Sequence, residues 1–224
     1  MGKKTIFFDL DDTLYDRSVP YCSAFAAFFG GKYADKVQTA FERTMLRGYE
    51  VFEAAHTGQM TMEAMHIYRY QTGLRDAGIE ITPEQALRMQ ALYAEEQRHI
   101  SLTPVMEEIL TFCRAHFAAM GVITNGGVQS QRDKLKSLGA ARWFRPELVL
   151  ISDALGVMKP GPEIFRIAEQ AGDAGVNHGC TPPPECRPPG GWTAHGSCPR
   201  PGRPRCRRGI PRAAHSARRP EWCP

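Results

Sequence analysis

The sequence lacks any long apolar run. None of its 224 residues lies in a stretch approaching the ~20 consecutive apolar residues that a transmembrane helix needs, although 42% of them are hydrophobic. The residues before the first apolar segment also lack the apolar region of a secretory signal peptide. We therefore expect a globular protein of the cytoplasm, with a substantial core and no membrane partner.

The last part of the sequence, residues 172–224, lacks lysine and any strand-like apolar run. It holds nine of the 28 basic residues, three of the 24 acidic ones, 11 of the 17 prolines and five of the seven cysteines. So few apolar residues cannot support a packed core, and we expect this tail to be disordered. The abrupt change near residue 172 suggests an out-of-frame translation of a GC-rich gene, which is our preferred hypothesis.

Two other interpretations of this tail remain open. Its five cysteines and three histidines could bind zinc, but no Cys-x₂-Cys pair is present and the spacings fit no common zinc finger. The basic run at residues 203–208 could bind nucleic acid, but it lacks lysine and interleaved aromatic residues. We do not expect nucleic acid as a partner, and the sequence carries no signal for an oligomeric state.

Three carboxylates follow the first apolar segment. Residues 6–8 read Ile-Phe-Phe, as in a short buried strand, and lead directly into Asp9, Asp11, Asp12 and Thr13. Ligands of open α/β sheets bind at the carboxyl ends of the strands, so this position suits a site. Asp9 and Asp11 could divide the work of nucleophile and proton shuttle. The alternative is an acidic turn that caps a helix, with Asp12 or Thr13 as the N-cap.

A purely helical pattern separates this segment from the next expected strand. Apolar residues recur at helical spacing in four stretches, at residues 19–29, 36–55, 61–73 and 83–97. A helical insert of this kind can form a lid over a site at the strand end, where exclusion of water helps reactions at charged centres. An ordinary helical subdomain with no gating role is the alternative.

Two further motifs follow at expected strand ends. The strand at residues 120–123 runs into Thr124-Asn125-Gly126, which can offer a hydroxyl and backbone N–H groups to a phosphate, although Asn-Gly is also a common turn. Another strand is expected at 148–151. Lys159 then adds a positive charge just before a helix N-terminus, where anions are favoured. The helices that complete this alternating α/β pattern are expected at residues 105–116, 128–138 and 163–170.

Taken in order, residues 9–13, 123–126 and 157–162 resemble the first three motifs of the haloacid dehalogenase-like superfamily. They look closest to its phosphatases with a helical cap after the first motif, including pyrimidine nucleotidase-like members. The resemblance covers about residues 1–171. It implies an α/β fold with a Rossmann-like parallel sheet, formed by residues 1–15 and 101–171, and an inserted α-helical cap at residues 16–100.

The resemblance also implies catalytic roles for three residues. Asp9 would be the nucleophile that forms an aspartyl-phosphate, and Asp11 would protonate the leaving oxygen and later activate water. Lys159 would hold Asp9 and the transferring group together against charge repulsion. Phosphoryl transfer of this kind depends mainly on positioning and charge neutralisation.

Substrate and metal ligands follow from the same resemblance. Thr124, with Asn125, Gly126 and the nearby backbone N–H groups, would bind the phosphoryl oxygens. Asp9 and Asp11 would bind Mg²⁺, which supplies most of the positive charge. The implied activity is Mg²⁺-dependent hydrolysis of a small phosphate monoester, either a nucleotide or a sugar phosphate.

Other functions on the same scaffold stay open. A phosphomutase or a dehalogenase-type hydrolase is one alternative, although dehalogenases of the family lack the second aspartate, so Asp11 favours phosphate chemistry. A non-catalytic protein that binds a phosphorylated ligand is another. Of the residues in the expected cap, Arg17, Arg47 and His56 could contact a substrate, but each is also an ordinary surface residue type.

The family's fourth motif, an apolar strand that ends in metal-binding acids, is missing. It should follow Lys159 by about 20–30 residues, but that region is rich in proline and contains no strand-like run. Gly172-Asp173 imitates the dipeptide without a strand before it. Activity could therefore be impaired, or another acid, Asp153 or Asp173, could replace the missing ligand.

Overall fold

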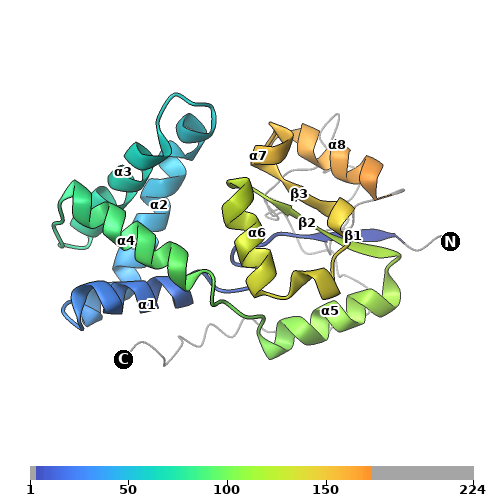
Figure 1. Ribbon diagram of the computed structural model, residues 1–224, viewed down its shortest axis with the longest axis horizontal. Coiled ribbons are helices and arrows are strands. Elements are labelled where there is room, and N and C mark those ends of the chain that lie inside the picture. Colours follow the sequence, from blue (N-terminus) through green and yellow to red (C-terminus); the bar gives the residue numbers. More distant parts are fainter. Residues whose placement is uncertain (1–3, 173–224) are drawn as a thin grey trace, which may run out of the picture.

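A computed structural model describes residues 4–172, which form a three-stranded parallel sheet with helices around it (Figure 1). The strands are β1 (Thr5–Phe8), β2 (Ala119–Thr124) and β3 (Val149–Ile151), in the order β1-β2-β3. The register pairs Phe8 with Val122 and Thr124 with Ile151. All three strands therefore end at one edge of the sheet, and the expected α/β fold with a parallel sheet is confirmed.

Helices cover both faces of this sheet, as far as residues 4–172 describe it. They are α5 (Pro104–His116), α6 (Val128–Ser137), α7 (Ser152–Leu155) and α8 (Pro162–Ala171), with short 3₁₀ turns at Ala140–Arg142 and Pro146–Leu148. Ile6 and Val122 pack in a cluster with α5 and α6, whereas Phe7 and Ile123 pack in a second cluster with α8. Neighbouring strand residues thus serve opposite faces, as the pleat of a strand requires.

Gly121 lets the middle strand approach its neighbours closely. A Cβ atom at this position would lie 2.5 Å from a ring carbon of Phe7 and 2.6 Å from the carbonyl oxygen of Leu148. Phe7 belongs to β1 and Leu148 directly precedes β3, so a side chain here would force β1 and the start of β3 away from β2. The absence of a side chain therefore helps to set the positions of the strand ends.

A helical segment lies between β1 and α5 in the sequence. It consists of α1 (Ser18–Phe29), a 3₁₀ turn (Ala34–Lys36), α2 (Val37–His56), α3 (Met62–Asp76) and α4 (Pro83–Glu96). Helix α4 begins with a capping box, in which Thr82 and Gln85 satisfy each other's backbone N–H groups. The helices end within a few residues of the positions that the apolar spacing predicts.

The helical segment has a hydrophobic core of its own. Buried aromatic and aliphatic side chains from all four helices form one cluster, among them Tyr21, Ala40, Tyr70 and Met89. The two stretches that join the helical segment to the α/β part leave from the carboxyl end of β1 and from the end of α4 (Figure 1). Its movement relative to the sheet would therefore be concentrated at these two connections.

The acids after β1 do not cap a helix, so that alternative is wrong. Helix α1 begins only at Ser18, with Arg17 at its N-cap position and no side chain capping it. Asp12 has a φ of 58°, in the left-handed region, within the turn after the strand. The Asp12 carboxylate accepts the backbone N–H of Arg17 at 3.1 Å, and the Asp11 carboxylate faces Lys134 of α6, so neither caps α1.

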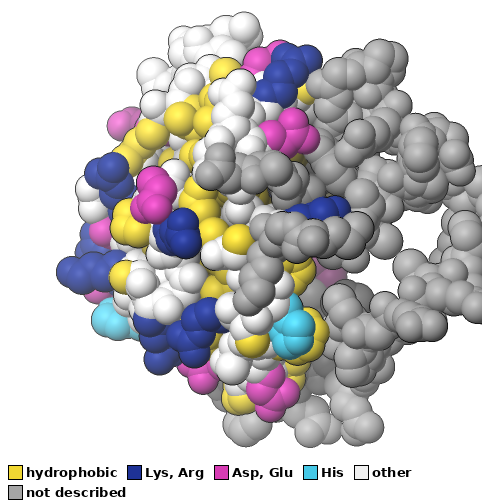
Figure 2. Space-filling view, turned by 90° about the vertical axis from the view of Figure 1, so that its right-hand side faces the viewer, with side chains coloured by type: hydrophobic (Ala, Val, Ile, Leu, Met, Phe, Trp, Pro, Cys, Tyr) yellow, Lys and Arg dark blue, Asp and Glu magenta, His cyan; other side chains and the backbone are white. Residues whose placement is uncertain are grey.

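The predictions made for residues 172–224 lie outside the described residues, apart from Gly172, which follows α8. These predictions are the disorder and the altered reading frame, the zinc and nucleic-acid alternatives, and the role of Asp173. Within residues 4–172, no helix is both long and apolar enough to cross a membrane. The face shown in Figure 2 mixes basic, acidic and apolar side chains over its described part.

Candidate active site

Polar side chains from three strand ends meet at the carboxyl edge of the sheet. Asp9 follows β1, Asn125 follows β2, and Ser152 follows β3. Lys159, from the loop before α8, joins them, since it contacts both Asp9 and Asn125. The structure therefore brings together residues that the sequence places more than a hundred positions apart.

Asp9 and Lys159 form an ion pair that solvent can reach. Lys159 Nζ lies 2.7 Å from Asp9 Oδ1, and the Asp9 side chain is 45% exposed. The same oxygen accepts a hydrogen bond from the Leu10 backbone N–H at 2.7 Å. Lys159 Nζ also donates to the Ile123 carbonyl of β2 at 3.0 Å, which fixes the amine over the strand ends. Among residues 4–172, no hydrogen bond reaches the second carboxylate oxygen of Asp9, which can therefore meet a ligand.

Asn125 holds the backbone of Lys159 in place. Its Nδ2 donates to the Lys159 carbonyl at 2.8 Å, and its Oδ1 accepts from the Lys159 N–H at 2.9 Å. Both ends of the amide are used in this reciprocal pair. Asn125, expected to contact a phosphate, therefore positions the lysine in this structure.

The hydroxyl of Thr124 points into the protein. Thr124 is almost fully buried, and its Oγ1 donates to Gln131 Oε1 at 3.2 Å. Gln131 comes from α6 and also donates to the Asn125 carbonyl at 3.3 Å. Contact of Thr124 with a phosphate would require this hydroxyl to leave Gln131.

Gly126 connects the loop after β2 to the helical segment. Its backbone N–H donates to Ser152 Oγ at 3.0 Å, and Ser152 Oγ lies 3.1 Å from Nε2 of His56 at the end of α2. The φ of Gly126 is 144°, and a Cβ atom here would lie 2.2 Å from Gln131 Nε2. The loop therefore requires glycine, and His56 places the helical segment within reach of the site.

Asp11 lies in a separate, partly buried arrangement, with its side chain 21% exposed. Lys134 Nζ, from α6, donates to both of its carboxylate oxygens, at 2.8 and 3.0 Å. The Tyr15 hydroxyl donates to Asp11 Oδ1 at 2.5 Å and accepts from Gln97 Nε2 at 3.1 Å. Asp9 and Asp11 are two residues apart but have different lysine partners.

These surroundings favour the ionised form of Asp11. Burial by itself raises the pKa of this carboxyl, but the charge and hydrogen bonds of Lys134, with the hydrogen bond of Tyr15, lower it below its ordinary value of 3.8. The hydroxyl of Tyr15 has a strongly raised pKa because it is buried and lies beside Asp11. Tyr15 therefore remains a donor to the carboxylate.

The two arginines proposed as substrate contacts in the expected cap, Arg17 and Arg47, have partners within the protein. Arg17 donates to Asp12 through Nε at 2.9 Å and contacts the Tyr49 hydroxyl at 2.5 Å. Arg47 is paired with Asp76 at 2.8 Å, on the surface of α2 and α3. Arg47 thus has a surface role, whereas Arg17 stands next to the first motif.

The described residues offer only part of a magnesium site. Of the expected ligands, Asp9 would provide a carboxylate oxygen and Asp11 its main-chain carbonyl, because the Asp11 side chain is occupied by Lys134. Asp153 accepts the Val128 N–H at 3.2 Å instead of joining Asp9. No group of three or more His, Cys, Asp or Glu residues that could hold a metal exists within residues 4–172. Mg²⁺ commonly uses one or two carboxylates plus substrate phosphate and water, so this partial set is compatible with it.

Sequence reasoning missed Lys134, Gln131, Tyr15, Gln97 and Ser152. A usable signal existed for two of them. Gln131 and Lys134 share the face of α6 that also carries buried Leu135 and Leu138. Polar residues on the apolar face of a helix need partners, and this helix directly follows a site motif.

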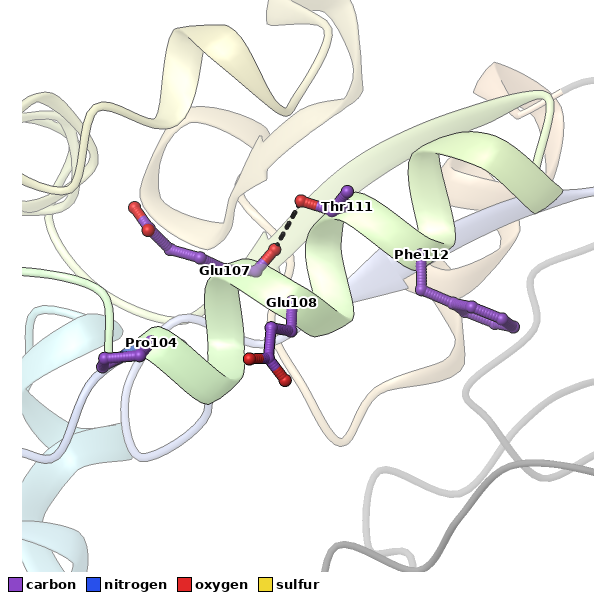
Figure 3. A pocket seen from close by; sticks show the side chains of 5 residues that line it. All are labelled: Pro104, Glu107, Glu108, Thr111 and Phe112. Carbon is purple, nitrogen blue, oxygen red and sulfur yellow. Dashed lines mark hydrogen bonds between the residues drawn. The ribbon is translucent and has the colours of Figure 1, made fainter.

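One open hollow on the described surface lies on α5, away from this site. It has a volume of about 530 Å³ and is lined by Pro104, Glu107, Glu108, Thr111 and Phe112, all from α5 (Figure 3). The two glutamates would repel a phosphate, and none of the lining residues is basic. The strand ends, not this cavity, are therefore the candidate active site.

Comparisons with known proteins place these residues in a wider group. The model of the haloacid dehalogenase-like hydrolase family matches residues 3–174. The phosphoserine phosphatase of Thermus thermophilus is 31% identical over 192 residues, covering 74% of each chain. The glyceraldehyde 3-phosphate phosphatase of Pyrococcus furiosus is 29% identical over 175 residues, covering 75% of this chain and 67% of that protein.

Solved structures share the architecture. The hydrolase YfnB of Bacillus subtilis, solved with magnesium bound, has a TM-score of 0.54 and 19% identity, with 76% of this chain and 72% of that chain covered. The L-2-haloacid dehalogenase of Xanthobacter autotrophicus has a TM-score of 0.53 and 19% identity, with 76% and 64% covered. At these identities the likeness is one of fold alone.

Proposed function

This chain belongs to the haloacid dehalogenase-like hydrolases, and we propose that it is a Mg²⁺-dependent phosphatase of small phosphate monoesters such as nucleotides or sugar phosphates. The observation that carries the proposal is the exposed Asp9 carboxylate paired with Lys159, with a second carboxylate, Asp11, held apart in a different environment. The relatives named as phosphoserine and glyceraldehyde 3-phosphate phosphatases support phosphate esters as the substrate class.

The proposed reaction has two steps. A carboxylate oxygen of Asp9 attacks phosphorus, and the bond from phosphorus to the leaving oxygen breaks while Asp11 gives that oxygen a proton. Water then attacks the aspartyl-phosphate at phosphorus and gives a proton to Asp11, which releases phosphate and restores Asp9. The contact with Lys134 suits the second step, since it favours ionised Asp11. The first step requires a proton on Asp11 and hence a weaker contact.

Lys159 and Mg²⁺ would share the task of charge neutralisation. Lys159 Nζ lies against Asp9 and would also lie close to a phosphoryl group held there. We propose Asp9 and the carbonyl of Asp11 as protein ligands of Mg²⁺, which, when bound, would reduce repulsion between the carboxylate and the phosphate. The proposal of Mg²⁺ dependence is tested by the metal requirement of turnover.

We also propose that the helical segment, residues 16–100, acts as a cap on a core formed by residues 1–15 and 101–171. Its contacts support this role, because His56 reaches Ser152 at the end of β3 and Gln97 reaches Tyr15 beside the first motif. Such a segment can exclude water from the reacting groups and contribute to substrate choice. Arg17 and His56 are the candidates for contact with the substrate.

The test is hydrolysis of p-nitrophenyl phosphate with and without Mg²⁺. We expect turnover that requires Mg²⁺ and that falls by about 10³-fold or more in Asp9→Asn, since the nucleophile is lost. Asp35→Asn, which changes an exposed aspartate of the helical segment, should leave the rate unchanged. Turnover that persists in Asp9→Asn would refute the proposed mechanism.

The same assay separates the alternative functions. Phosphate binding without turnover by the folded protein would indicate a non-catalytic binding protein. Release of halide from 2-chloropropionate without metal would indicate a dehalogenase-type hydrolase. Transfer of phosphate between positions on a sugar phosphate, without net release, would indicate a phosphomutase.

A further inference from the structure

Lys134 is a buried cation at the edge of the proposed active site. Its side chain is only 6% exposed, and its Nζ donates to both carboxylate oxygens of Asp11, at 2.8 and 3.0 Å. A buried ammonium group is costly unless it is paired with good geometry. The position of Lys134 is itself fixed, because neighbouring Leu135 and Leu138 pack in the core beneath the sheet.

A second contact ties the same carboxylate to the helical segment. Tyr15 and Gln97 are both buried, and the Tyr15 hydroxyl accepts from Gln97 while it donates to Asp11. Gln97 directly follows the last residue of α4. Three consecutive hydrogen-bonded contacts therefore run from α6 through Asp11 and Tyr15 to the end of the helical segment.

We propose that Lys134, Tyr15 and Gln97 are positioning residues for Asp11: Lys134 anchors the carboxylate on the core side, and the Tyr15–Gln97 bond makes its orientation depend on the placement of the helical segment. The inference rests on the proposed function, in which Asp11 transfers protons. The contacts of the three converge on Asp11, so they act on the reaction through this carboxylate. A shift of the α4 end would alter the Tyr15 contact and with it the direction of the carboxylate.

Steady-state kinetics with p-nitrophenyl phosphate and Mg²⁺ test the role of Lys134. We expect Lys134→Met to lower kcat by about 10- to 100-fold with little change in KM, because misplacement of a proton-transfer group slows chemistry without removing the phosphate contacts. Lys134→Arg, which keeps the positive charge, should recover part of this loss. Lys136→Met, at an exposed lysine of the same helix, is the matched control and should behave like the wild type.

A combined variant separates positioning from general stability. If Lys134 acts through Asp11, adding Lys134→Met to Asp11→Asn should lower kcat no further than Asp11→Asn alone, since the coupled residues are not additive. The double variant removes both charges of the buried pair and leaves neither one unpaired, so we expect a circular dichroism spectrum like that of the wild type. A further loss of kcat in the double variant would overturn the inference.

A separate variant tests the hydrogen bond between Gln97 of the helical segment and Tyr15. Gln97→Leu removes the donor to Tyr15 but leaves Asp11 and Lys134 in place, and we expect kcat to fall by about three- to tenfold at constant KM. An unchanged kcat would overturn the part of the inference that concerns the helical segment.

The outcomes distinguish this inference from the function on which it rests. Turnover that depends on Asp9, with Lys134→Met as active as Lys136→Met, would overturn the inference and leave the phosphatase in place. Absence of turnover in the folded wild type would overturn both.

Discussion

Two aspartates of one short loop, Asp9 and Asp11, pair with lysines from different elements, and the two pairs differ in burial. Asp9 and Lys159 lie 2.7 Å apart with side chains 45% and 16% exposed, whereas the side chains of Asp11 and Lys134 are 21% and 6% exposed. The open pair leaves an oxygen free for a ligand, but the buried pair engages both oxygens of its carboxylate. The two lysines therefore differ in their proposed roles: Lys159 meets the reacting group directly, and Lys134 orients Asp11.

The difference arises from the elements that supply the lysines. Lys159 comes from a loop that Asn125 holds at the strand ends, on the solvent side. Lys134 comes from a helix whose apolar face enters the core. A loop can offer a charge to a substrate, while a packed helix fixes a charge within the protein.

The largest expected effect is on catalysis and concerns the more exposed pair, Asp9 and Lys159. We expect Lys159→Met to lower kcat/KM by about 10³-fold, equivalent to about 4 kcal/mol of transition-state stabilisation. Lys159→Arg should recover little, because Nζ fits between Asp9 Oδ1 and the Ile123 carbonyl. A loss of less than tenfold in the p-nitrophenyl phosphate assay would contradict the assignment of Lys159 to the reaction.

The second prediction concerns stability, for which we expect the Asp11–Lys134 pair to matter more than the Asp9–Lys159 pair. Lys134→Met should lower the free energy of unfolding by about 2 kcal/mol, because it removes the ion pair of Asp11, whose side chain is only 21% exposed. Lys159→Met should change it by less than about 1 kcal/mol, since the exposed pair is screened by solvent. Urea unfolding without metal would measure both variants. Equal losses would show that burial does not separate the two pairs.

The third prediction is a pH dependence of the buried pair. The pKa of Asp11 lies below its ordinary value of 3.8, so the pair stabilises the fold at pH values above 3.8, and this stabilisation is lost as the pH falls through the lowered pKa. Urea unfolding of the wild type should therefore lose more free energy between about pH 6 and pH 3 than that of Asp11→Asn/Lys134→Met. Parallel curves for the two proteins would contradict the lowered pKa.

The smallest effect concerns the contact between α2 and the end of β3. His56→Ala removes the hydrogen bond to Ser152 and should lower the free energy of unfolding by about 0.5–1.5 kcal/mol. His99→Ala, at an exposed histidine, is the control. A loss as large as that of Lys134→Met would mean that the helical segment depends on His56 far more than a single bond implies.

Much of the fold was predictable because its patterns are local. Alternation of Ile6 and Phe7 between two faces, and the spacing of apolar residues in α1–α4, reflect periods that can be read along the chain. The turn after β1 was harder. The left-handed conformation of Asp12 goes with its side-chain contacts to Arg17, which the apolar periods of the sequence do not indicate.

The site was predictable where motifs end strands and obscure where partners come from elsewhere. Asp9 and Lys159 follow from their motifs, and the structure places them in contact. Lys134 and Gln97 form their contacts across 123 and 82 positions of the chain, so no local sequence pattern predicts these contacts. The inward turn of the Thr124 hydroxyl likewise depends on Gln131 of the following helix.

The pairing of Asn125 with the backbone of Lys159 has a consequence for the chemical ageing of the protein. Asn-Gly sequences lose their side-chain amide when the glycine nitrogen attacks the asparagine carbonyl, which forms a cyclic imide. Here the Gly126 N–H is bonded to Ser152, and the Asn125 amide is bonded at both ends. The folded chain should therefore resist deamidation at this position. In an unfolded chain, Asn125 could be converted to aspartate. After refolding, a carboxylate oxygen would then face the Lys159 carbonyl in place of the Nδ2 donor, and the hydrogen bond that positions Lys159 would be lost.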